Sequence, residues 1–417
     1  MLKQIEGSRA IAQVIAMCRP QVICAYPITP QTHIVEGLSE LVKDGTLPGC
    51  AFINVESEFA ALSVAIGSSA TGARSYTATS SQGLLFMAEA VYNASGLGLP
   101  IVMTLGTRAI GAPINIWNDH SDAMSMRDAG WIMLFAEDNQ EAIDMHIQAF
   151  RLAEQLSCPV MVCVDGFILT HAFERLDLPS QAQVDAFLPP YVPAQVLDPA
   201  DPVSIGAMVG PDAFSEVRYL AHYKQIEALS VIPALGAEFA EQFGRTSGGL
   251  LHSYRATDAV TVIVAMGSVN GTIQDVVDAM RDEGHAIGSV ALTTFRPFPL
   301  LELRDALEHA QRIVVVEKSL AVGLGGTLAS NVRMALRGSS VPVFTTIAGL
   351  GGRPITQASL RLLFEHAERD ELEDVTFLDL NWDVVNREIA RIHGSRRSGP
   401  IAESILRDLS TAPVKAT

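Results

Sequence analysis

The first residues that could take part in binding or catalysis lie in a loop that contains two prolines. Residues 26–30 read Tyr-Pro-Ile-Thr-Pro and directly follow the apolar run 22–25. Pro27 and Pro30 fix their own φ angles and keep the preceding residues out of the helical region. We therefore expect a stiff loop that presents the Thr29 hydroxyl at the carboxyl end of a strand, where open α/β sheets bind ligands. A stiffened connector without a ligand explains the pattern equally well.

The second loop carries paired carboxylates. Glu56 and Glu58 come just before a segment, 59–69, that is rich in Ala, Gly and Ser. A carboxylate at such a position can transfer protons, but acidic residues in a first helical turn also complement the helix dipole. The small residues make the following helix thin enough for close approach of another backbone or subunit, which favours the catalytic alternative.

The third loop carries an arginine. Arg108 follows the apolar run 101–105 within the Gly-containing segment 106–113. A guanidinium there can hold a carboxylate through two parallel hydrogen bonds; pairing with a neighbouring Asp or Glu is the alternative. Residues 118–122 bring Asp119, His120 and Asp122 together, and we interpret them as a hydrogen-bonded anchor for this loop, because no His-rich element accompanies them.

These loops require alternating strands and helices to position them. Runs rich in apolar, β-branched or aromatic residues at 22–25, 52–55, 75–79, 101–105 and 159–164 predict strands, and helical spacing predicts helices at 34–42, 59–69, 84–95 and 139–154. Similar runs at 261–267, 289–292, 312–316 and 341–345 predict four further strands. This alternation is typical of a parallel sheet covered on both faces. We expect a parallel-sheet α/β domain over residues 1–175, a Pro-rich arm with helices packed on the body or a partner over 176–256, a smaller α/β domain over 257–375, and a helical tail over 376–417.

Bulk properties exclude several classes of protein. Of the 417 residues, 48% are hydrophobic and 18% charged, so we expect extensive burial in a core or against partner subunits. The net charge of −17 argues against a nucleic-acid partner. The five cysteines are scattered, which predicts reduced core residues without a disulfide, zinc or iron–sulfur site. No apolar run reaches the ~20 residues of a membrane span, no signal-peptide layout is present, and we expect a cytoplasmic protein.

Nucleotide and hydrolase motifs are missing from the sequence. There is no Walker A sequence and no Gly-x-Ser-x-Gly elbow. Residues 323–326 read Gly-Leu-Gly-Gly, which does not satisfy the dinucleotide-binding order, and we interpret them as a tight turn at an interface. The chain therefore has no visible diphosphate cradle of its own.

Taken together, the loops resemble a known family. The order of short segments is similar to that of the α subunit of the thiamine-diphosphate-dependent 2-oxoacid:acceptor oxidoreductases, the pyruvate:ferredoxin oxidoreductase family, over about residues 5–370. The segments that carry the resemblance are 26–30, 56–58, 79–84, 107–109, 119–122, 165–167, 296–299 and 349–353. The resemblance implies a pyrimidine-binding, transketolase-like domain followed by a domain similar to the transketolase C-terminal domain, which serves in subunit assembly.

The resemblance also implies roles for individual residues. Glu58 would hydrogen-bond N1′ of the aminopyrimidine and favour the tautomer that removes the C2 proton. Arg108 would bind the substrate carboxylate and Thr29 the same end of the substrate. Pro27, Ser81 and Gln82 would complete the cofactor contacts. No metal ligand is expected in this chain.

Partners follow from the same resemblance. A β subunit would carry the diphosphate site, Mg²⁺ and a [4Fe-4S] cluster, with γ- and δ-type subunits beside it and an NAD-reducing subunit in one branch. Coenzyme A would be the co-substrate. The whole chain also resembles the aryl branch of the family, and the low Lys to Arg ratio agrees with that branch. Our first expectation is therefore phenylglyoxylate oxidation to benzoyl-CoA with NAD as final acceptor; the alternatives are a pyruvate or branched-chain 2-oxo acid:ferredoxin oxidoreductase, and a non-catalytic scaffold subunit.

Overall fold

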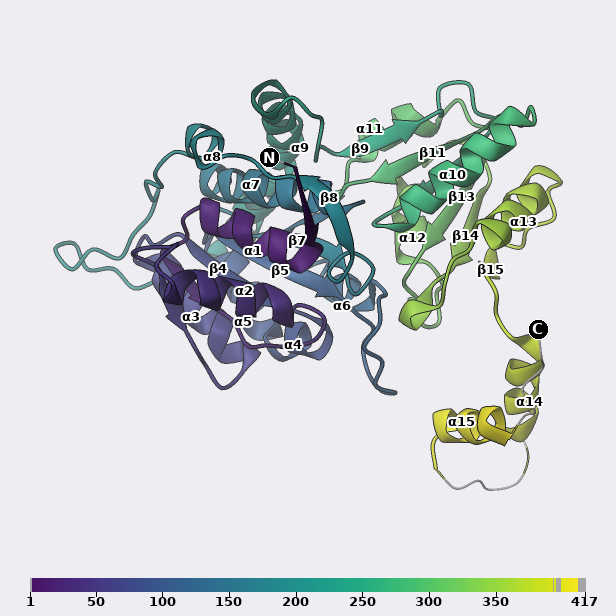
Figure 1. Cartoon of the computed structure of the whole chain (residues 1–417), viewed down its shortest axis with the longest axis horizontal. Coiled ribbons are helices and arrows are strands. Elements are labelled where there is room, and N and C mark those ends of the chain that lie inside the picture. Colours follow the sequence, from purple (N-terminus) through teal and green to yellow (C-terminus); the bar gives the residue numbers. More distant parts are fainter. Residues whose placement is uncertain (1, 393, 395–398, 412–417) are drawn as a thin grey trace. The chain divides into compact units, whose positions relative to one another are not determined.

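A computed structural model describes residues 2–392, 394 and 399–411 of the chain. The chain divides into two compact units, Met1–Thr376 and Phe377–Thr417. The first unit contains two large sheets, both mainly parallel, with helices packed on their faces (Figure 1). This arrangement confirms the expected α/β fold class.

The larger sheet has seven strands in the order β12-β6-β7-β5-β4-β2-β3. Six of them run parallel to their neighbours, and the edge strand β12 pairs antiparallel with β6 although it comes from a distant part of the sequence. The strands are β2 (Val22–Cys24), β3 (Ala51–Ile53), β4 (Ser75–Thr79), β5 (Ile101–Thr107), β6 (Ile132–Phe135), β7 (Val160–Asp165) and β12 (Thr294–Arg296).

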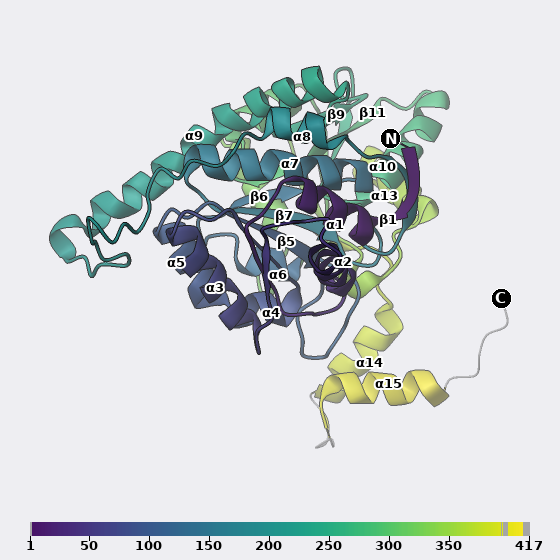
Figure 2. The ribbon, with the colours of Figure 1, turned by 60° about the vertical axis from the view of Figure 1, so that its left-hand side comes forward.

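Helices cover both faces of this sheet (Figure 2). One face packs against α1 (Gly7–Met17), α2 (Thr32–Lys43) and α7 (Asn139–Leu156). The other packs against α3 (Glu58–Ala70), α4 (Ser81–Phe86), α5 (Ala88–Gly96) and α6 (Ser121–Ser125). Successive strand residues alternate between the two cores: Val160 and Val162 belong to the first and Met161 to the second, because side chains point to opposite faces along a strand.

Two local expectations differ from the structure. The single helix expected over 84–95 is two helices, because the backbone leaves helical geometry at Met87 (φ −93°, ψ 12°) without a Gly or Pro at that position to signal the break. The first helix also begins earlier, at Ser81. In addition, β1 (Leu2–Glu6) and β8 (Phe173–Asp177) form a separate antiparallel pair that joins the chain's start to the segment after β7.

The second sheet has six strands in the order β15-β14-β13-β10-β11-β9. Strands are found at all four of the regions expected from the sequence in this part. The strands are β9 (Leu251–Tyr254), β10 (Thr261–Ala265), β11 (Ile287–Leu292), β13 (Arg312–Glu317), β14 (Val343–Ile347) and β15 (Val375–Phe377). The helices of this region are α10 (Val269–Asp282), α11 (Leu300–Leu307), α12 (Thr327–Ala335), the short 3₁₀ helix η1 (Leu350–Gly352) and α13 (Gln357–Glu368).

The segment between the two sheets contains α8 (Gln181–Phe187) and the long α9 (Pro211–Phe243). The second half of α9 packs along α7 and buries Ile232, Phe239 and Phe243 (Figure 2). The first half leaves its apolar side chains exposed, among them Tyr219, which is 65% exposed. The second half of α9 therefore packs on the body of the first unit.

The second unit contains α14 (Trp382–Ile392) and α15 (Ile401–Thr411). Residues 393, 395–398 and 412–417 of the expected helical tail lie outside the described residues. None of the helices that the structure describes has both the length and the apolar character that a membrane crossing requires.

Candidate active site

The candidate residues come from loops that leave one edge of the larger sheet. Strands β5, β4, β2 and β3 are consecutive neighbours and run parallel, so their carboxyl ends lie side by side. Thr29 follows β2, Glu58 follows β3, and Arg108 follows β5. Ser81 and Gln82 follow β4. The topology thus brings together the loops that the sequence singled out.

Arg108 and Thr29 are in direct contact. The Arg108 Nη1 donates to the backbone carbonyl of Thr29 at 2.9 Å, and its Nε donates to the carbonyl of Asn115 at 3.0 Å. Arg108 is only 7% exposed. The peptide bond between Thr29 and Pro30 is cis, and Pro30 is buried. The backbone of Thr29, not its hydroxyl, therefore fixes the arginine.

The Arg108 guanidinium has no acidic partner among the residues that the structure describes. Within the described part of the chain, no carboxylate oxygen lies within 4.0 Å of it, so the pairing with a neighbouring Asp or Glu that the sequence left open is absent. Burial lowers the pKa of Arg108, and the nearby Asp122 carboxyl opposes this shift. A buried cation with unused donors is suited to an external anion.

Glu58 is the first residue of α3 and lies almost completely buried, at 7% exposure. The helix is capped by Ser57, whose hydroxyl accepts the Ala60 N–H at 3.2 Å. Among the described residues, none donates a hydrogen bond to the Glu58 carboxylate. A buried carboxylate without a partner costs free energy, which is typical of a group that meets a ligand.

Gly83 lets the β4 loop approach this carboxylate. A Cβ atom at Gly83 would lie 2.8 Å from Glu58 Oε1 and 2.5 Å from Thr79 Oγ1, so no larger residue fits there. Thr79 Oγ1 is itself buried without a hydrogen-bond partner in the described structure. The sequence segment 79–84 therefore forms a close wall beside Glu58.

Asp122 joins the β4 and β5 loops. Its Oδ2 accepts the N–H of Ser81 at 2.8 Å and the N–H of Arg108 at 3.0 Å. The residue is fully buried. Burial raises the pKa of Asp122, and the donated N–H groups, that of Ser81 foremost, oppose the rise. The expectation that residues 118–122 anchor the arginine loop is confirmed.

The remaining candidates have less defined surroundings. Ser81 adopts a left-handed backbone with φ 47°, and its hydroxyl donates to the carbonyl of Ala109 at 2.6 Å. Gln82 lies beside Gly111, where a Cβ atom would be 2.5 Å from its Nε2. Pro27 is exposed in the same loop as Thr29 and has no polar side-chain atom to fix a ligand. Among the described residues, no hydrogen bond links Pro27 to Glu58.

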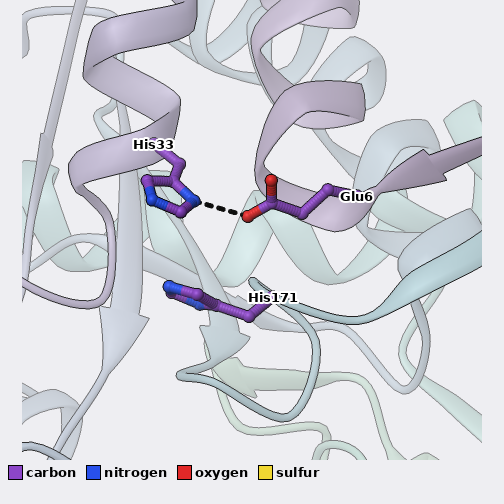
Figure 3. A group of neighbouring side chains, drawn as sticks. All are labelled: Glu6, His33 and His171. Atoms are coloured by element: carbon purple, nitrogen blue, oxygen red, sulfur yellow. Dashed lines mark hydrogen bonds and ion pairs between the residues drawn. The ribbon is translucent and has the colours of Figure 1, made fainter.

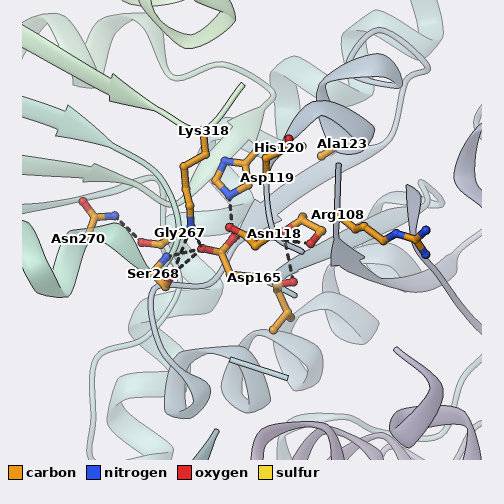
Figure 4. A network of polar contacts seen from close by, with 12 residues as sticks. Arg108, Asn118, Asp119, His120, Ala123, Asp165, Gly267, Ser268, Asn270 and Lys318 are labelled. Atoms are coloured by element: carbon orange, nitrogen blue, oxygen red, sulfur yellow. Dashed lines mark hydrogen bonds and ion pairs between the residues drawn. The ribbon is translucent and has the colours of Figure 1, made fainter. Parts of the chain in front are cut away.

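A second polar cluster lies behind the arginine, centred on Asp165 at the end of β7 (Figure 4). Its carboxylate accepts from Lys318 Nζ at 2.6 Å and contacts His120 Nε2 at 2.7 Å. Ser268 donates to it through both its N–H and its hydroxyl. Burial favours the neutral carboxyl, but Lys318 and His120 outweigh it and hold the pKa of Asp165 well below its usual range.

This cluster reaches the site through Thr107, the residue before Arg108. Thr107 Oγ1 donates to Asp165 Oδ1 at 3.2 Å, and Asn118 Nδ2 donates to the same hydroxyl at 2.8 Å. The Arg108 side chain points away from Asp165 (Figure 4). The cluster therefore fixes the backbone at Thr107. The Arg108 guanidinium lies on the opposite side of the loop and does not take part in the cluster.

Sequence reasoning missed two members of this cluster. Lys318 and Ser268 both lie in loops directly after strands of the second sheet, β13 and β10. The rule that identified Thr29, polar residues at the carboxyl end of an apolar strand, applies to them as well. A further omission is Gln31, which is fully buried, donates to the Tyr26 carbonyl at 2.9 Å, and has an unpartnered Oε1.

The glycine run 323–326 forms a turn, as expected. Its carbonyl and N–H groups pair between Ala321 and Gly325, and the helix that follows, α12, receives a carboxylate of the chain itself. Glu317 accepts the N–H groups of Leu328 and Ala329 at 2.8 and 3.1 Å. Because this helix start is already filled by an internal anion, the run does not present a free phosphate site.

The chain is similar to known proteins over most of its length. Residues 13–234 match the model of the pyruvate flavodoxin/ferredoxin oxidoreductase, thiamine diphosphate-binding family, and residues 259–360 match pyruvate:ferredoxin oxidoreductase core domain II. Pyruvate synthase subunit PorA of Methanosarcina barkeri is 46% identical over 390 residues, covering 91% of this chain and 97% of that protein. Ketoisovalerate oxidoreductase subunit VorA of Pyrococcus horikoshii is 39% identical over 370 residues, covering 88% of this chain and 94% of that protein.

A solved structure supports the fold. The 2-oxoglutarate:ferredoxin oxidoreductase from Magnetococcus marinus, with 2-oxoglutarate, coenzyme A and succinyl-CoA bound, superposes with a TM-score of 0.68 at 18% identity. The match covers 88% of this chain and 65% of that one. With the family models and the relatives, the sequence-based recognition is confirmed: the chain belongs to the thiamine-diphosphate-dependent pyruvate flavodoxin/ferredoxin oxidoreductase family, as the α subunit of a 2-oxoacid oxidoreductase.

Proposed function

We propose that this chain forms the pyrimidine side of the active site in a coenzyme-A-dependent pyruvate:ferredoxin-type oxidoreductase. The overall reaction converts a 2-oxo acid and coenzyme A to an acyl-CoA and CO₂, and passes two electrons to the acceptor. The observation that carries the proposal is the pair of Glu58 and Arg108 at one sheet edge. One is a buried carboxylate and the other a buried cation, and neither has an ionic partner among the described residues.

The relatives favour pyruvate over the aryl substrate that was our first expectation. The proteins named above are subunits of pyruvate synthase and ketoisovalerate oxidoreductase, and the family name includes ferredoxin and flavodoxin. Phenylglyoxylate and NAD have no support from these relatives. The VorA similarity makes a branched-chain 2-oxo acid the second candidate.

The residues around Glu58 are compatible with an aminopyrimidine. None of the described residues donates a hydrogen bond to its carboxylate, and the absence of a side chain at Gly83 leaves the β4 loop close beside it. When bound, thiamine diphosphate supplies the nucleophilic carbon and accepts the electron pair released by decarboxylation. Its diphosphate and Mg²⁺ would be held by a β subunit, since the sequence here has no diphosphate cradle. The [4Fe-4S] clusters would also belong to partner chains.

Each residue then has a stated task. Glu58 would hold the N1′ side of the pyrimidine through a short hydrogen bond and keep a proton available there. Arg108 would bind the carboxylate of the 2-oxo acid with the donors that Thr29 and Asn115 leave unused. Ser81 and Gln82 would line the cofactor, held in place through Asp122.

The first experiment changes Glu58→Gln in the complex assembled with its β partner. The amide preserves shape but cannot exchange the proton, so we expect the steady-state rate to fall about 10²- to 10⁴-fold, with proton exchange at cofactor C2 reduced in parallel and assembly intact. Glu89→Gln is the matched control, because Glu89 is an exposed acid in the first turn of α5. Normal turnover by the Glu58 variant would favour the scaffold alternative.

The second experiment compares substrates. The purified complex should reduce a viologen dye in the presence of coenzyme A with pyruvate, and less rapidly with branched-chain 2-oxo acids or phenylglyoxylate. A faster rate with a branched-chain acid would select the second candidate. The isolated chain should be inactive with each substrate, because it contains only one side of the site.

A further inference from the structure

Two histidines and a glutamate converge at a place that the active site does not use (Figure 3). Glu6 precedes α1, His33 lies in the first turn of α2, and His171 lies in the loop after β7. One ligand-type atom from each side chain lies within 4.8 Å of the other two. The three residues are far apart in the sequence, so no spacing pattern could indicate them.

The geometry is that of an almost formed metal site. His33 Nδ1 lies 2.6 Å from Glu6 Oε1, and the three ligand-type atoms all lie within 4.8 Å of one another. Zinc bonds of about 2.0–2.2 Å in a tetrahedron separate ligand atoms by roughly 3.4 Å, which falls between these spacings. Small side-chain movements would therefore bring all three atoms into coordination.

The surroundings orient His171 for this role. Phe167 N–H donates to Thr170 Oγ1 at 2.8 Å, and the same oxygen lies 2.8 Å from His171 Nδ1. When Nδ1–H donates to that oxygen, the lone pair of His171 is on Nε2, as in metal sites whose histidines are fixed by an outer hydrogen bond. Phe167 also stacks on the ring at a centroid distance of 4.6 Å.

The backbone around the cluster is also prearranged. Ser8 donates to the Thr170 carbonyl through its N–H at 3.0 Å and its hydroxyl at 2.7 Å, which fixes the start of α1 to the His171 loop. Burial and the neighbouring His33 lower the pKa of His171. Glu6 is 9% exposed and His33 remains partly accessible, which leaves a path for an ion.

We propose that Glu6, His33 and His171 bind one divalent transition-metal ion of the zinc type. Two imidazoles and a carboxylate are a ligand set that such ions prefer, with water completing the coordination. The ion would link α1, the start of α2 and the loop after β7. The loop with Thr29 leads directly into α2, and Pro30 packs against Gly166. The ion would therefore restrict the movement of both segments next to Thr29.

The alternative is a plain ion pair between Glu6 and His33, with His171 as a bystander. His171→Gln separates the two, because it leaves the Glu6–His33 contact intact. The experiment titrates the chelator-treated full-length chain with Zn²⁺ alone and measures bound metal and the unfolding temperature. We expect one equivalent of Zn²⁺ and a raised unfolding temperature, since an ion that binds only the native state stabilises it.

Variants and spectroscopy complete the test. His171→Gln and His33→Gln should each weaken zinc binding at least about 10-fold, a loss that even an outer-shell change can cause. His222→Gln, on the exposed part of α9, should have no effect. X-ray absorption at the zinc edge should show nitrogen and oxygen neighbours, without the sulfur neighbours at about 2.3 Å that cysteine ligation gives.

Three results would overturn the proposal. They are failure of the folded wild-type chain to bind stoichiometric zinc, binding that is unchanged by either histidine substitution, and a sulfur-containing shell. Circular dichroism of each variant establishes that it is folded. A folded His171→Gln variant that binds zinc like the wild type would identify the cluster as an ion pair only.

Discussion

Arg108 shows how the loop keeps a buried cation available. A guanidinium has five N–H donors. In the described structure two backbone carbonyls, those of Thr29 and Asn115, accept hydrogen bonds from it. Neutral carbonyls fix the orientation without cancelling the charge. A carboxylate partner would have done both, and would have competed with a substrate anion. The contacts therefore separate positioning from charge neutralisation.

A substitution at Arg108 tests this separation. Arg108→Lys keeps the charge but loses the planar fork, so we expect the KM for the 2-oxo acid to rise about 10-fold or more, with a smaller change in kcat. Arg108→Gln removes the charge as well and should raise the KM further, since a hydrogen bond to a charged group contributes about 1.5–3 kcal/mol to binding. Initial rates of the assembled complex over a range of 2-oxo acid concentrations measure both effects.

The control is Arg175→Gln, in the exposed part of β8. It should leave KM unchanged. If Arg108→Gln instead lowered kcat with KM unaffected, the arginine would not bind the ground-state carboxylate.

At the scale of elements, the sequence predicted the parts that follow simple periodicity. The strands β4, β5, β7, β10 and β13 are buried because both faces of their sheets are covered, and each was recognised from its run of residues. The positions of the site loops could then be predicted, because a parallel sheet presents the loops after its strands at one edge. Glu58, Thr29 and Arg108 could therefore be named without coordinates.

Other elements could not be recognised for physical reasons. The strand β12 is only three residues long and pairs with β6, more than 150 positions earlier in the chain, so tertiary contact defines it. The break at Met87 coincides with a fully buried side chain and not with a helix-breaking residue. The ligand atoms of Glu6, His33 and His171 are likewise brought together only by the fold.

Asp122 belongs to this scale because it couples two loops. Its carboxylate accepts the N–H groups of Ser81, the first residue of α4, and of Arg108, the first residue after β5. In Asp122→Asn one carboxylate oxygen becomes an NH₂ group, which must face a backbone donor. We expect the free energy of unfolding to fall by about 1–3 kcal/mol, the cost of an unsatisfied buried group. Urea unfolding of the purified chain measures it.

The same variant should also affect the site. With the loops uncoupled, the KM for the 2-oxo acid should rise even though Asp122 touches no substrate. Asp305→Asn, on the exposed face of α11, is the control and should change neither quantity. Loss of stability with an unchanged KM would limit Asp122 to a structural role.

At the scale of the first unit, one apolar core spans both sheets. Met133 and Met161 of the larger sheet and Val264 and Val315 of the second belong to the same buried cluster. The Asp165 cluster lies where the loops of the two sheets meet, since Asp165 ends β7 and Lys318 follows β13. The Lys318–Asp165 ion pair therefore links the ends of one strand from each sheet.

Lys318→Met tests the energetic importance of that pair. The methionine fills similar volume but leaves the buried Asp165 charge with only His120 and neutral donors, so we expect the free energy of unfolding at pH 7 to fall by about 3–5 kcal/mol. In the wild type the pKa of Asp165 is lowered in the folded state, so its contribution is complete above the unfolded value of about 3.9 and is lost as the pH falls through the folded value. In the variant, protonation relieves the unpaired charge.

The loss in free energy of unfolding relative to the wild type should therefore be largest at neutral pH and should shrink below about pH 4. Urea unfolding across this range measures the deficit, with Lys43→Met, exposed at the end of α2, as the control. A deficit independent of pH would mean that lost packing, and not the charge of Asp165, causes the destabilisation.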